Sequence, residues 1–374
     1  MIDIILVAVS ILSSTLCGFI FIPLIMKFCE EKKLYDIPDA RKVHIKAIPR
    51  LGGISFLPSM LLASLVAVII LNHNFQGQAI TLSTWSITFF ISLLLIYSIG
   101  IVDDLVGLGA KTKFSVQIIA ATILPLSGLY INNLYGFCGI HEIPFSIGSV
   151  LTVFTIVFVC NAINLIDGID GLSAGLSLIA LSGFLVCFFR EGIIAYSILI
   201  AGLIGILIPF LYFNIFGKAE NNRKIFMGDS GSLTLGFILG FLFVKFTMDN
   251  PNVKHFRLES MMLAYSLLIV PSFDVVRVTL VRLFHKAHIF QADKNHIHHK
   301  LMRTGINQHM TLICIMALTI AFFLMNLFMW YILRTNMSYI VAADIVGWFL
   351  VNYYINKFIL RNGQPVYLEN KKES

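Results

Sequence analysis

Apolar stretches of about twenty residues recur along nearly the whole chain, and they restrict its fold more than any other feature. A helix of about 20 apolar residues crosses a ~30 Å hydrocarbon core, so each stretch is long enough to span a membrane. The composition agrees, because 58% of the 374 residues are hydrophobic and the mean hydropathy is +0.87. The sequence therefore predicts an all-α polytopic membrane protein. We expect eleven spans, at residues 4–26, 51–71, 84–102, 114–132, 148–165, 171–189, 193–213, 231–247, 259–281, 310–333 and 339–360.

Lysine and arginine are unevenly distributed between the loops. When alternate loops are assigned to opposite sides, the minority side carries Arg190, Lys245, Lys254, Arg257 and Arg334, and the remaining basic residues of the loops fall on the other side. Cytoplasmic loops are the basic ones, so we expect the amino terminus outside and the carboxyl terminus in the cytoplasm. Residues 4–26 lack a preceding basic segment and a cleavage site, which favours a retained helix over a signal peptide.

No low-complexity run, internal repeat or soluble domain is visible in the sequence. We therefore expect one transmembrane domain over residues 1–360 and a short cytoplasmic tail over 361–374. The net charge of +7 follows mainly from the basic loops, and no nucleic-acid-binding motif accompanies it. The six cysteines lack CxxC spacing, so we interpret them as packing residues.

The carboxylates gather on the side of the membrane that carries most of the lysines and arginines. In "IVDDLVGLGAKTKF", Asp103 and Asp104 follow an apolar helix directly, with Lys113 in the next loop. A single Asp near a helix end usually caps the helix or pairs with a lysine. Two adjacent carboxylates repel each other unless a cation or a proton relieves them, which favours a divalent metal or a proton-transfer role.

The stretch "NLIDGIDGL" places Asp167 and Asp170 three residues apart, so a helical turn brings them to one face. Asn164 adds an amide to that face, and Gly168 permits a close approach of the backbone to a ligand. We interpret this stretch as a polar ligand-binding face at a helix end.

In "IFMGDSGSLTLGF", Gly228 and two serines surround Asp229 at the start of an apolar helix. Backbone N–H groups at such a start favour an anion, and the carboxylate suits Mg²⁺, although an Asp here can equally be an N-cap. In "ADKNHIHHKL", His296, His298 and His299 lie without a cysteine nearby, which favours hydrogen bonding to phosphate over zinc ligation. The basic stretch "DIPDARKVHIKAIPRLGG" taken alone is typical of a solvated loop.

Together these five stretches closely resemble the polyprenyl-phosphate N-acetylhexosamine-1-phosphate transferases, the group that contains MraY, WecA and TagO. The resemblance runs from about residue 36 to 300 and includes the order and loop placement of each motif. The "HIHH" form and the eleven expected helices resemble the WecA branch more than the MraY branch.

The resemblance implies transfer of N-acetylhexosamine 1-phosphate from a UDP-sugar to undecaprenyl phosphate, with release of UMP, at the cytoplasmic face of a bacterial inner membrane. It implies that Asp229 binds Mg²⁺, with Mn²⁺ as an alternative, and that Asp103 binds or deprotonates the lipid phosphate beside Asp104 and Lys113. The implied nucleotide pocket and diphosphate contacts comprise Asn164, Asp167, Gly168, Asp170, Phe226, Gly228, His296, His298 and His299, with Arg41, His44 and Arg50 in the uridine-side loop. A homodimer is left open.

The chain departs from the family pattern between Asn214 and Lys224, where "FNIFGKAENNRKIFMGD" is about five residues longer than usual and lacks the usual prolines. The role of the family's lysine in this connection falls to Lys218 or Lys224, and the sequence does not separate them. The expected donor is UDP-N-acetylglucosamine, with a 6-deoxy or C4-epimeric relative as the alternative. The competing hypothesis is a cation-coupled transporter. The position of the acids at helix ends and the lack of an internal repeat in the sequence argue against it.

Overall fold

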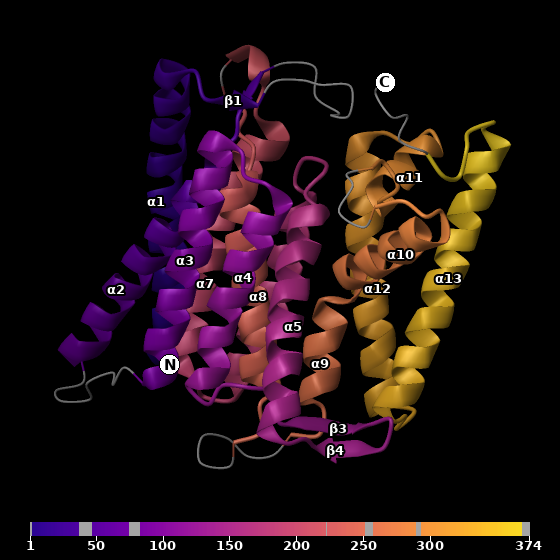
Figure 1. Ribbon diagram of the computed structural model, residues 1–374. Coiled ribbons are helices and arrows are strands. Elements are labelled where there is room, and N and C mark those ends of the chain that lie inside the picture. The colour runs from indigo at the N-terminus through magenta and orange to yellow at the C-terminus, as the bar shows by residue number, and fades with distance from the viewer. Residues whose placement is uncertain are drawn as a thin grey trace.

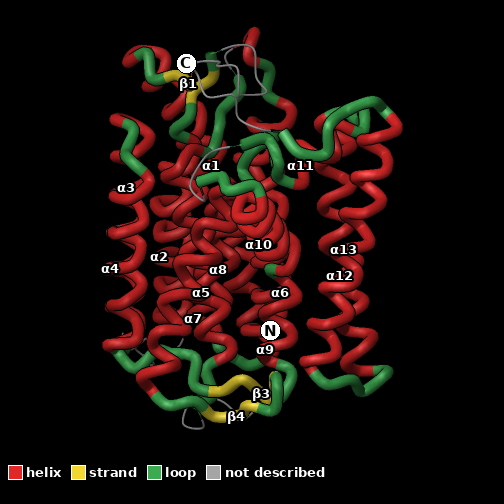
Figure 2. Tube along the Cα trace, turned by 45° about the vertical axis from the view of Figure 1, so that its right-hand side comes forward, coloured by secondary structure: helices red, strands yellow, loops and turns green. Residues whose placement is uncertain are grey.

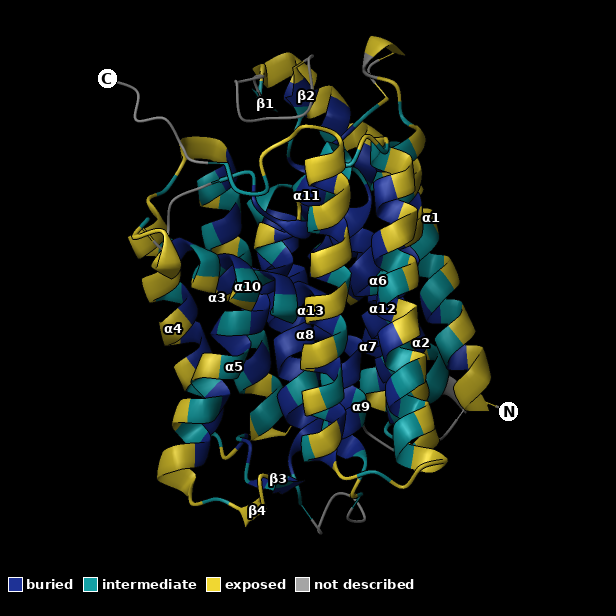
Figure 3. Cartoon of the chain, turned by 90° about the vertical axis from the view of Figure 1, so that its right-hand side faces the viewer, coloured by how far each residue is buried: buried dark blue, intermediate teal, exposed yellow. Residues whose placement is uncertain are grey.

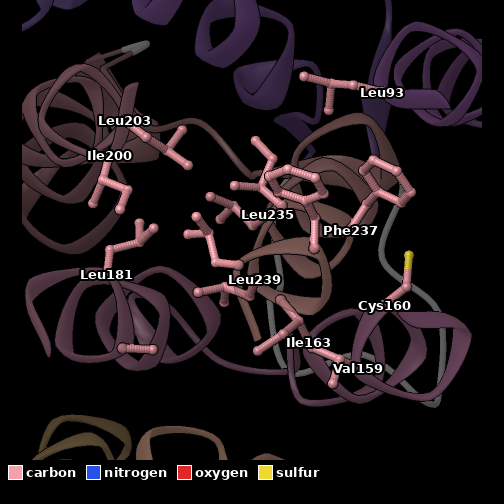
Figure 4. Packing of buried hydrophobic residues seen from close by; sticks show 14 of the residues in the cluster. Leu93, Val159, Cys160, Ile163, Leu181, Ile200, Leu203, Leu235, Phe237 and Leu239 are labelled. Carbon is pink, nitrogen blue, oxygen red and sulfur yellow. The ribbon is translucent and has the colours of Figure 1, made fainter. Parts of the chain in front are cut away.

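The centre of the protein is helix α8 (Gly228–Thr247), whose residues from Ser230 onward are almost all buried. Its glycines allow this burial, because the neighbouring helix backbone comes close enough to exclude a larger side chain. A Cβ on Gly236 would lie 2.6 Å from Cα of Cys160, and one on Gly240 would lie 3.1 Å from Cα of Ile156, both on helix α5 (Phe145–Leu165). Figure 4 shows Leu235, Phe237 and Leu239 of α8 surrounded by apolar side chains of the neighbouring helices.

The structure is a computed structural model, and it describes residues 2–36, 47–74, 83–221, 223–250, 257–288 and 293–368. The other helices form an all-α bundle around α8 (Figure 1). They are α1 (Ile2–Lys32), α2 (Phe56–Asn74), α3 (Thr84–Val106), α4 (Ala110–Leu126), α6 (Leu172–Arg190), α7 (Ile194–Leu211), α9 (Ser260–Leu267), α10 (Ile269–Phe284), α11 (Ile297–Arg303), α12 (Gln308–Tyr331) and α13 (Met337–Arg361).

The apolar side chains of the outer helices face outward as well as inward. Figure 3 shows exposed residues along the outer surfaces of the bundle, and many of them are large aliphatic or aromatic residues, such as Leu16, Val150 and Phe349. A soluble protein rarely exposes so much contiguous apolar surface, whereas a protein that faces lipid does. The prediction of a multi-pass all-α membrane protein is therefore confirmed.

Nine helices in the described ranges are long and apolar enough to cross a membrane. The stretches expected at 114–132 and 259–281 correspond to α4, which has 17 residues, and to α9 and α10, two shorter helices that follow each other. The count of eleven spans stays a prediction.

The carboxyl-terminal part of the chain forms a second layer beside the α8 bundle. Helices α12 and α13 stand to one side in Figures 1 and 2, and they pack with α9, α10 and α11 around Ile297, Ile315 and Trp348. Part of the expected tail belongs to this layer, because Arg303 donates to the carbonyl of Pro365 at 2.9 Å and the side chain of Asn295 exchanges two hydrogen bonds with the backbone of Leu368.

The two ends of the bundle differ. One end carries an antiparallel hairpin of β3 (Asn133–Phe137) and β4 (Ile140–Glu142), in which Phe137 pairs with Ile140. The other end carries the antiparallel pair β1 (Tyr35–Asp36) and β2 (Ile48–Pro49), together with α11 and the last described residues (Figure 1). The first residues of α8 lie at this second end, as do the motifs that carry the acids.

Candidate active site

The start of α8 is held by a carboxylate from a different helix. Asp104, at the end of α3, accepts hydrogen bonds from the backbone N–H groups of Asp229 at 2.8 Å and Ser230 at 2.9 Å. The side chain of Asp104 is buried, so these bonds satisfy donors that a helix start otherwise leaves unpaired. Asp104 therefore orients the first turn of α8, and with it the side chain of Asp229.

Glycines let three segments meet at this point. The segment after β2 lies along the residues before α8: Phe226 donates to the carbonyl of Pro49 at 2.7 Å, and Gly53 donates to the carbonyl of Met227 at 2.8 Å. A Cβ on Gly53 would overlap the backbone of Gly231, and one on Gly228, whose φ is +73°, would overlap the carbonyl of Arg50. The glycines of "IPRLGG" and "GDSG" therefore serve close backbone packing.

Two of the predicted carboxylates share one cation. The Nζ atom of Lys113 lies 3.1 Å from Oδ2 of Asp103 and 2.6 Å from Oδ2 of Asp229. The other oxygen of Asp229 accepts a hydrogen bond of 3.1 Å from the amide of Asn164, which also donates to Ser232. Residues from α3, α4 and α5 thus converge on Asp229 of α8. In the sequence, these residues lie in three separate motifs.

The turn between α5 and α6 is shaped by Gly171 and by a buried asparagine. Gly171 has a φ of +75°, and its N–H donates to Oδ1 of Asn214 at 2.6 Å. The amide of Asn214 in turn donates to the carbonyl of Ile225 at 2.8 Å, which ties this turn to the segment before α8. The turn presents Asp170 to Lys224 at 2.6 Å, so the cation near the pocket in this longer connection is Lys224 rather than the exposed Lys218.

A polar cavity of about 470 Å³ lies between these segments. Five carboxylates reach it, and two basic side chains, Arg50 and Lys224, share its lining. Desolvation by the surrounding protein is the first cause that raises the pKa of the Asp167 carboxyl, to about 8. The negative charges of Asp229, Asp170 and Asp104 follow as further causes. The neighbouring carboxylates act in this direction because an adjacent negative charge disfavours the ionised form of a carboxyl group. The remaining lining residues are Ile48, Asn164, Gly168, Ile169, Asn214, Phe226, Met227, Gly228, His299 and Gln308, with Asp103 completing the acids.

The histidine motif is held by a buried carboxylate of α10. Asp274 accepts from Nδ1 of His296 at 2.8 Å, from the N–H of Ile297 at 3.0 Å and from Arg277 at 2.8 Å. Arg277 also donates to the carbonyl of Asn295 at 2.6 Å. Three consecutive residues at the start of the motif are therefore anchored to α10.

His298 packs against the turn between α5 and α6. A Cβ on Gly168 would overlap its imidazole ring, which explains why this position is a glycine. His298 is 1% exposed, and neither ring nitrogen has a hydrogen-bond partner in the described part of the chain. Burial, followed by the charges of His299 and His296, lowers the pKa of His298 well below its usual value. Burial, followed by His296 and Lys294, lowers the pKa of His299 to about 4, so both rings are neutral at pH 7.

A second, larger hollow adjoins the cavity. It is an apolar groove of about 920 Å³ between α4 and α5 on one wall and α10 on the other. Its walls include Phe114, Val153 and Phe154, whereas one end is polar. That end is lined by Lys113, Arg282, Asp293, His296, His298 and His299. Asn164, Gly168 and His299 line both the groove and the cavity.

The structure brings most of the predicted site residues to these two hollows. Lys113, His296 and His298 line the groove but not the polar cavity, and Arg41 and His44 lie outside the described residues. Sequence reasoning did not assign a role to Asn214, Asp274 or Gln308. Asp274 was visible as an Asp within an apolar stretch, but its partner lies 22 residues away in the chain, and no spacing rule links them.

Comparison with known proteins adds independent support. Residues 85–247 match the model of glycosyl transferase family 4. A relative from Bacillus subtilis (strain 168), named probable undecaprenyl-phosphate N-acetylglucosaminyl 1-phosphate transferase, is 32% identical over 312 residues, which cover 83% of this chain and 81% of the relative.

Two further relatives carry similar names. The undecaprenyl-phosphate alpha-N-acetylglucosaminyl 1-phosphate transferase of Escherichia coli (strain K12) is 26% identical, over 83% of this chain and 80% of its own length. The decaprenyl-phosphate N-acetylglucosaminephosphotransferase of Mycobacterium leprae (strain TN) is 31% identical, over 72% of this chain and 70% of its own length. These similarities favour an enzyme over a cation-coupled transporter. The chain belongs to glycosyl transferase family 4, within the polyprenyl-phosphate N-acetylhexosamine-1-phosphate transferases.

Proposed function

We propose that the enzyme transfers N-acetylglucosamine 1-phosphate from UDP-N-acetylglucosamine to undecaprenyl phosphate and releases UMP. The observation that carries this proposal is the junction of a polar cavity with an apolar groove beside Asp229. A nucleotide-sugar needs hydrogen-bonding and charged groups, whereas a polyprenyl chain needs an apolar channel, and the reaction needs the two phosphates to meet. The names of the relatives from Bacillus subtilis and Escherichia coli support the same donor sugar and acceptor lipid.

The polar cavity accommodates the donor in this proposal. Phe226 offers a ring that can stack on uracil, and Asp167 or Asp170 offers a carboxylate that can accept the uracil N–H. Gly168 lets the donor approach the backbone, and the cations Arg50 and Lys224 offset diphosphate charge. We assign Arg41 and His44 to the uridine side by resemblance alone.

The apolar groove accommodates the polyprenyl chain. Phe114, Phe145, Val150 and Phe154 offer an apolar surface along α4 and α5, and the polar end of the groove lies beside Lys113. A lipid that enters from the membrane would therefore place its chain in the groove and its phosphate near Asp103 and Asp229.

The carboxylates of Asp229 and Asp103 fit a divalent cation, because they already converge on one positive charge, that of Lys113. The described residues contain no group of three His, Cys, Asp or Glu side chains that could hold a metal by themselves. Mg²⁺ nevertheless fits, since it commonly uses one or two carboxylates and completes its shell with water and substrate phosphates. Asp229 would be the principal ligand, and the ion would offset charge on the diphosphate.

The protein's own residues then position the two phosphates. An oxygen of the lipid phosphate attacks the β-phosphorus of the UDP-sugar, the bond from that phosphorus to the bridging oxygen breaks, and UMP leaves with that oxygen. Lys113 neutralises charge near the acceptor, Asn164 holds the orientation of Asp229, and Asp104 fixes the first turn of α8. His299, which is neutral and lines both hollows, can donate a hydrogen bond to the diphosphate, and His298, which is neutral and lines the groove, can donate one where the two phosphates meet. Asp103 positions the acceptor phosphate or takes its remaining proton.

The experiment that tests this function measures UMP release from UDP-N-acetylglucosamine and undecaprenyl phosphate in membranes that contain the protein, with and without Mg²⁺. Release that depends on both substrates and on the metal is expected. Failure to release UMP from any UDP-N-acetylhexosamine would contradict the proposal.

We also propose the finer choice of donor. Ile297 separates the first histidine from the other two, and the Ile297 side chain is buried, so it adds no polar contact for a larger sugar substituent. A panel of UDP-sugars, with the lipid-linked products identified by mass, should show use of UDP-N-acetylglucosamine and rejection of UDP-N-acetylmuramoyl-pentapeptide. Exclusive use of a 6-deoxy sugar would overturn the choice of donor and leave the reaction unchanged.

The proposed topology has eleven crossings, an outer amino terminus and the active site at the cytoplasmic face of a bacterial inner membrane. The basic loops support it. In intact cells, a cysteine at Asn221, beside the cavity end, should resist a membrane-impermeant thiol reagent, and one at Asn250, beyond the other end of α8, should react. Reaction at Asn221 would overturn the orientation. A cysteine at Lys371, outside the described residues, should be shielded as well.

A further inference from the structure

The three histidines of the motif do not share one environment. His299 lines both hollows, whereas His296 lines the polar end of the apolar groove and is not among the residues that line the polar cavity. If the cavity holds the nucleotide-sugar and the groove holds the lipid, His299 faces both substrates, whereas His296 faces only the lipid. His296 lies on the acceptor side.

Of the two ring nitrogens of His296, the described part of the chain engages one. Its Nδ1 atom lies 2.8 Å from Oδ2 of Asp274, and a carboxylate accepts, so Nδ1 carries a proton. In the described residues, Nε2 of His296 has no hydrogen-bond partner. The ring is thus fixed in orientation by one nitrogen while the other can contact a ligand at the polar end of the groove.

The two basic side chains at this end of the groove, Lys113 and Arg282, already form ion pairs. Arg282 pairs with Asp293 at 2.8 Å, and Lys113 pairs with Asp103 and Asp229. Lys113 comes from α4 and His296 from the segment after α10, so the two come from opposite walls of the groove. A phosphate at the end of the groove would lie between them.

Asp274 has the geometry of a residue that acts through His296. It is 0% exposed, and each of its oxygens accepts a hydrogen bond, from His296 on one and from Ile297 and Arg277 on the other. It lines neither hollow, so it touches neither proposed substrate. Partners of this kind hold a ligand-binding histidine in one orientation, and their loss commonly costs about 10- to 100-fold in affinity at metal sites.

We propose that His296 binds the phosphate of the acceptor lipid and that Asp274 is the positioning residue that orients its ring. This inference rests on the proposed function, and it assigns to the acceptor a histidine that the sequence resemblance places with the donor diphosphate. It predicts that the two substrates respond differently to changes at this pair.

The test uses the purified full-length protein and measures KM for each substrate. His296→Gln should raise KM for undecaprenyl phosphate about tenfold, the loss expected for one charge-assisted hydrogen bond, and leave KM for UDP-N-acetylglucosamine within about twofold. Asp274→Asn should shift the same KM in the same direction. An equal rise in both KM values, or no rise in the lipid KM, would overturn the assignment of His296.

A double variant separates positioning from general destabilisation. If Asp274 acts through His296, adding Asp274→Asn to His296→Gln should change the lipid KM by less than about twofold, whereas independent effects would multiply. The matched control is Asp344→Asn, which changes another fully buried carboxylate, bonded to Asn326 in the α12–α13 layer, and should leave both KM values unchanged. If Asp274→Asn does not fold, Asp274→Glu replaces it in the same double-mutant cycle. Effects of the two substitutions on the lipid KM that multiply would again overturn the positioning role of Asp274.

A binding measurement keeps this inference distinct from the proposed function. Undecaprenyl phosphate alone, without donor or metal, should raise the melting temperature of the wild-type protein, and His296→Gln should lose most of that rise. A wild-type protein that is stabilised by the lipid but releases no UMP would contradict the proposed reaction and leave the acceptor site standing. Full stabilisation of His296→Gln would contradict the inference.

Discussion

The polar cavity and the apolar groove meet at Asn164, Gly168 and His299, yet their walls differ in nearly every other respect. The cavity gathers carboxylates and cations from helix ends and loops at one end of the bundle. The groove is walled mainly by phenylalanine, valine and other apolar side chains of α4 and α5, and it is polar at one end. The difference indicates that one site handles two chemically unlike substrates, and that the shared residues lie where their reacting groups meet.

This comparison separates three classes of substitution. A change at the reacting centre should abolish turnover, a change at the junction should affect both substrates, and a change on the far wall of one hollow should affect one substrate. Each expectation can be checked with variants that leave the other hollow intact.

The largest effect is expected at Asp229, which lines the cavity and contacts Lys113 and Asn164 of the groove wall. Asp229→Asn replaces a charged oxygen ligand by an amide and should lower turnover about 100- to 1,000-fold at saturating Mg²⁺. UMP release measures the loss, and a melting curve checks that the variant is folded. Asp344→Asn serves as the control of equal chemistry. Near-normal turnover in Asp229→Asn would contradict the assignment of Asp229 as the metal ligand and as part of the reacting centre.

A smaller but still large effect is expected at the junction. Gly168→Ala would place a methyl group against the ring of His298, and a displacement of about 1 Å can cost as much as 100-fold in rate. Turnover should fall about 10- to 100-fold, and binding of donor and acceptor should both weaken. Gly109→Ala is the control, because a Cβ there meets nothing within 4 Å. An effect on one substrate alone would show that Gly168 is not part of a shared junction.

A one-sided effect is expected on the far wall of the cavity. Lys224→Ala removes the partner of Asp170 and should raise KM for the UDP-sugar about tenfold, with little change in KM for the lipid. The exposed Lys218→Ala, in the same connection, should leave both values unchanged. If Lys218 rather than Lys224 alters donor binding, the cavity as described is not the donor site.

The smallest effect concerns pH. The pKa of His299, lowered to about 4, means that the folded protein binds fewer protons than the unfolded chain between about pH 4 and pH 6.5. Stability should therefore fall as the pH drops through this window, and His299→Gln should reduce the fall in melting temperature by about 1–2 °C between pH 7.5 and pH 5. His141→Gln, in the exposed strand β4, is the control. If the melting temperature of the His299→Gln variant falls as much as that of the wild type, the His299 ring is not held neutral in the folded protein.

Much of the site could be predicted from local patterns. Asp103, Asp167, Asp170 and Asp229 each stand beside an apolar helix with glycines or lysines nearby, and they do line one cavity. The role of Asp104 could not be predicted in the same way. Its neighbour in the chain, Asp103, contacts Lys113, while Asp104 lies on another face of α3 and holds the start of α8, which begins more than 120 residues later.

The sequence by itself determined that this chain is a bundle of membrane helices with its acids and histidines in loops and at helix ends, because hydropathy and charge act through local composition. The tertiary structure decided which of those groups meet. Lys113 joins Asp103 to Asp229, Asp274 holds His296, and Gly168 receives His298 because close helix packing brings together residues that are far apart in the chain. Contacts of this kind depend on how the helices cross, and the spacing of residues along the chain does not determine the crossing geometry.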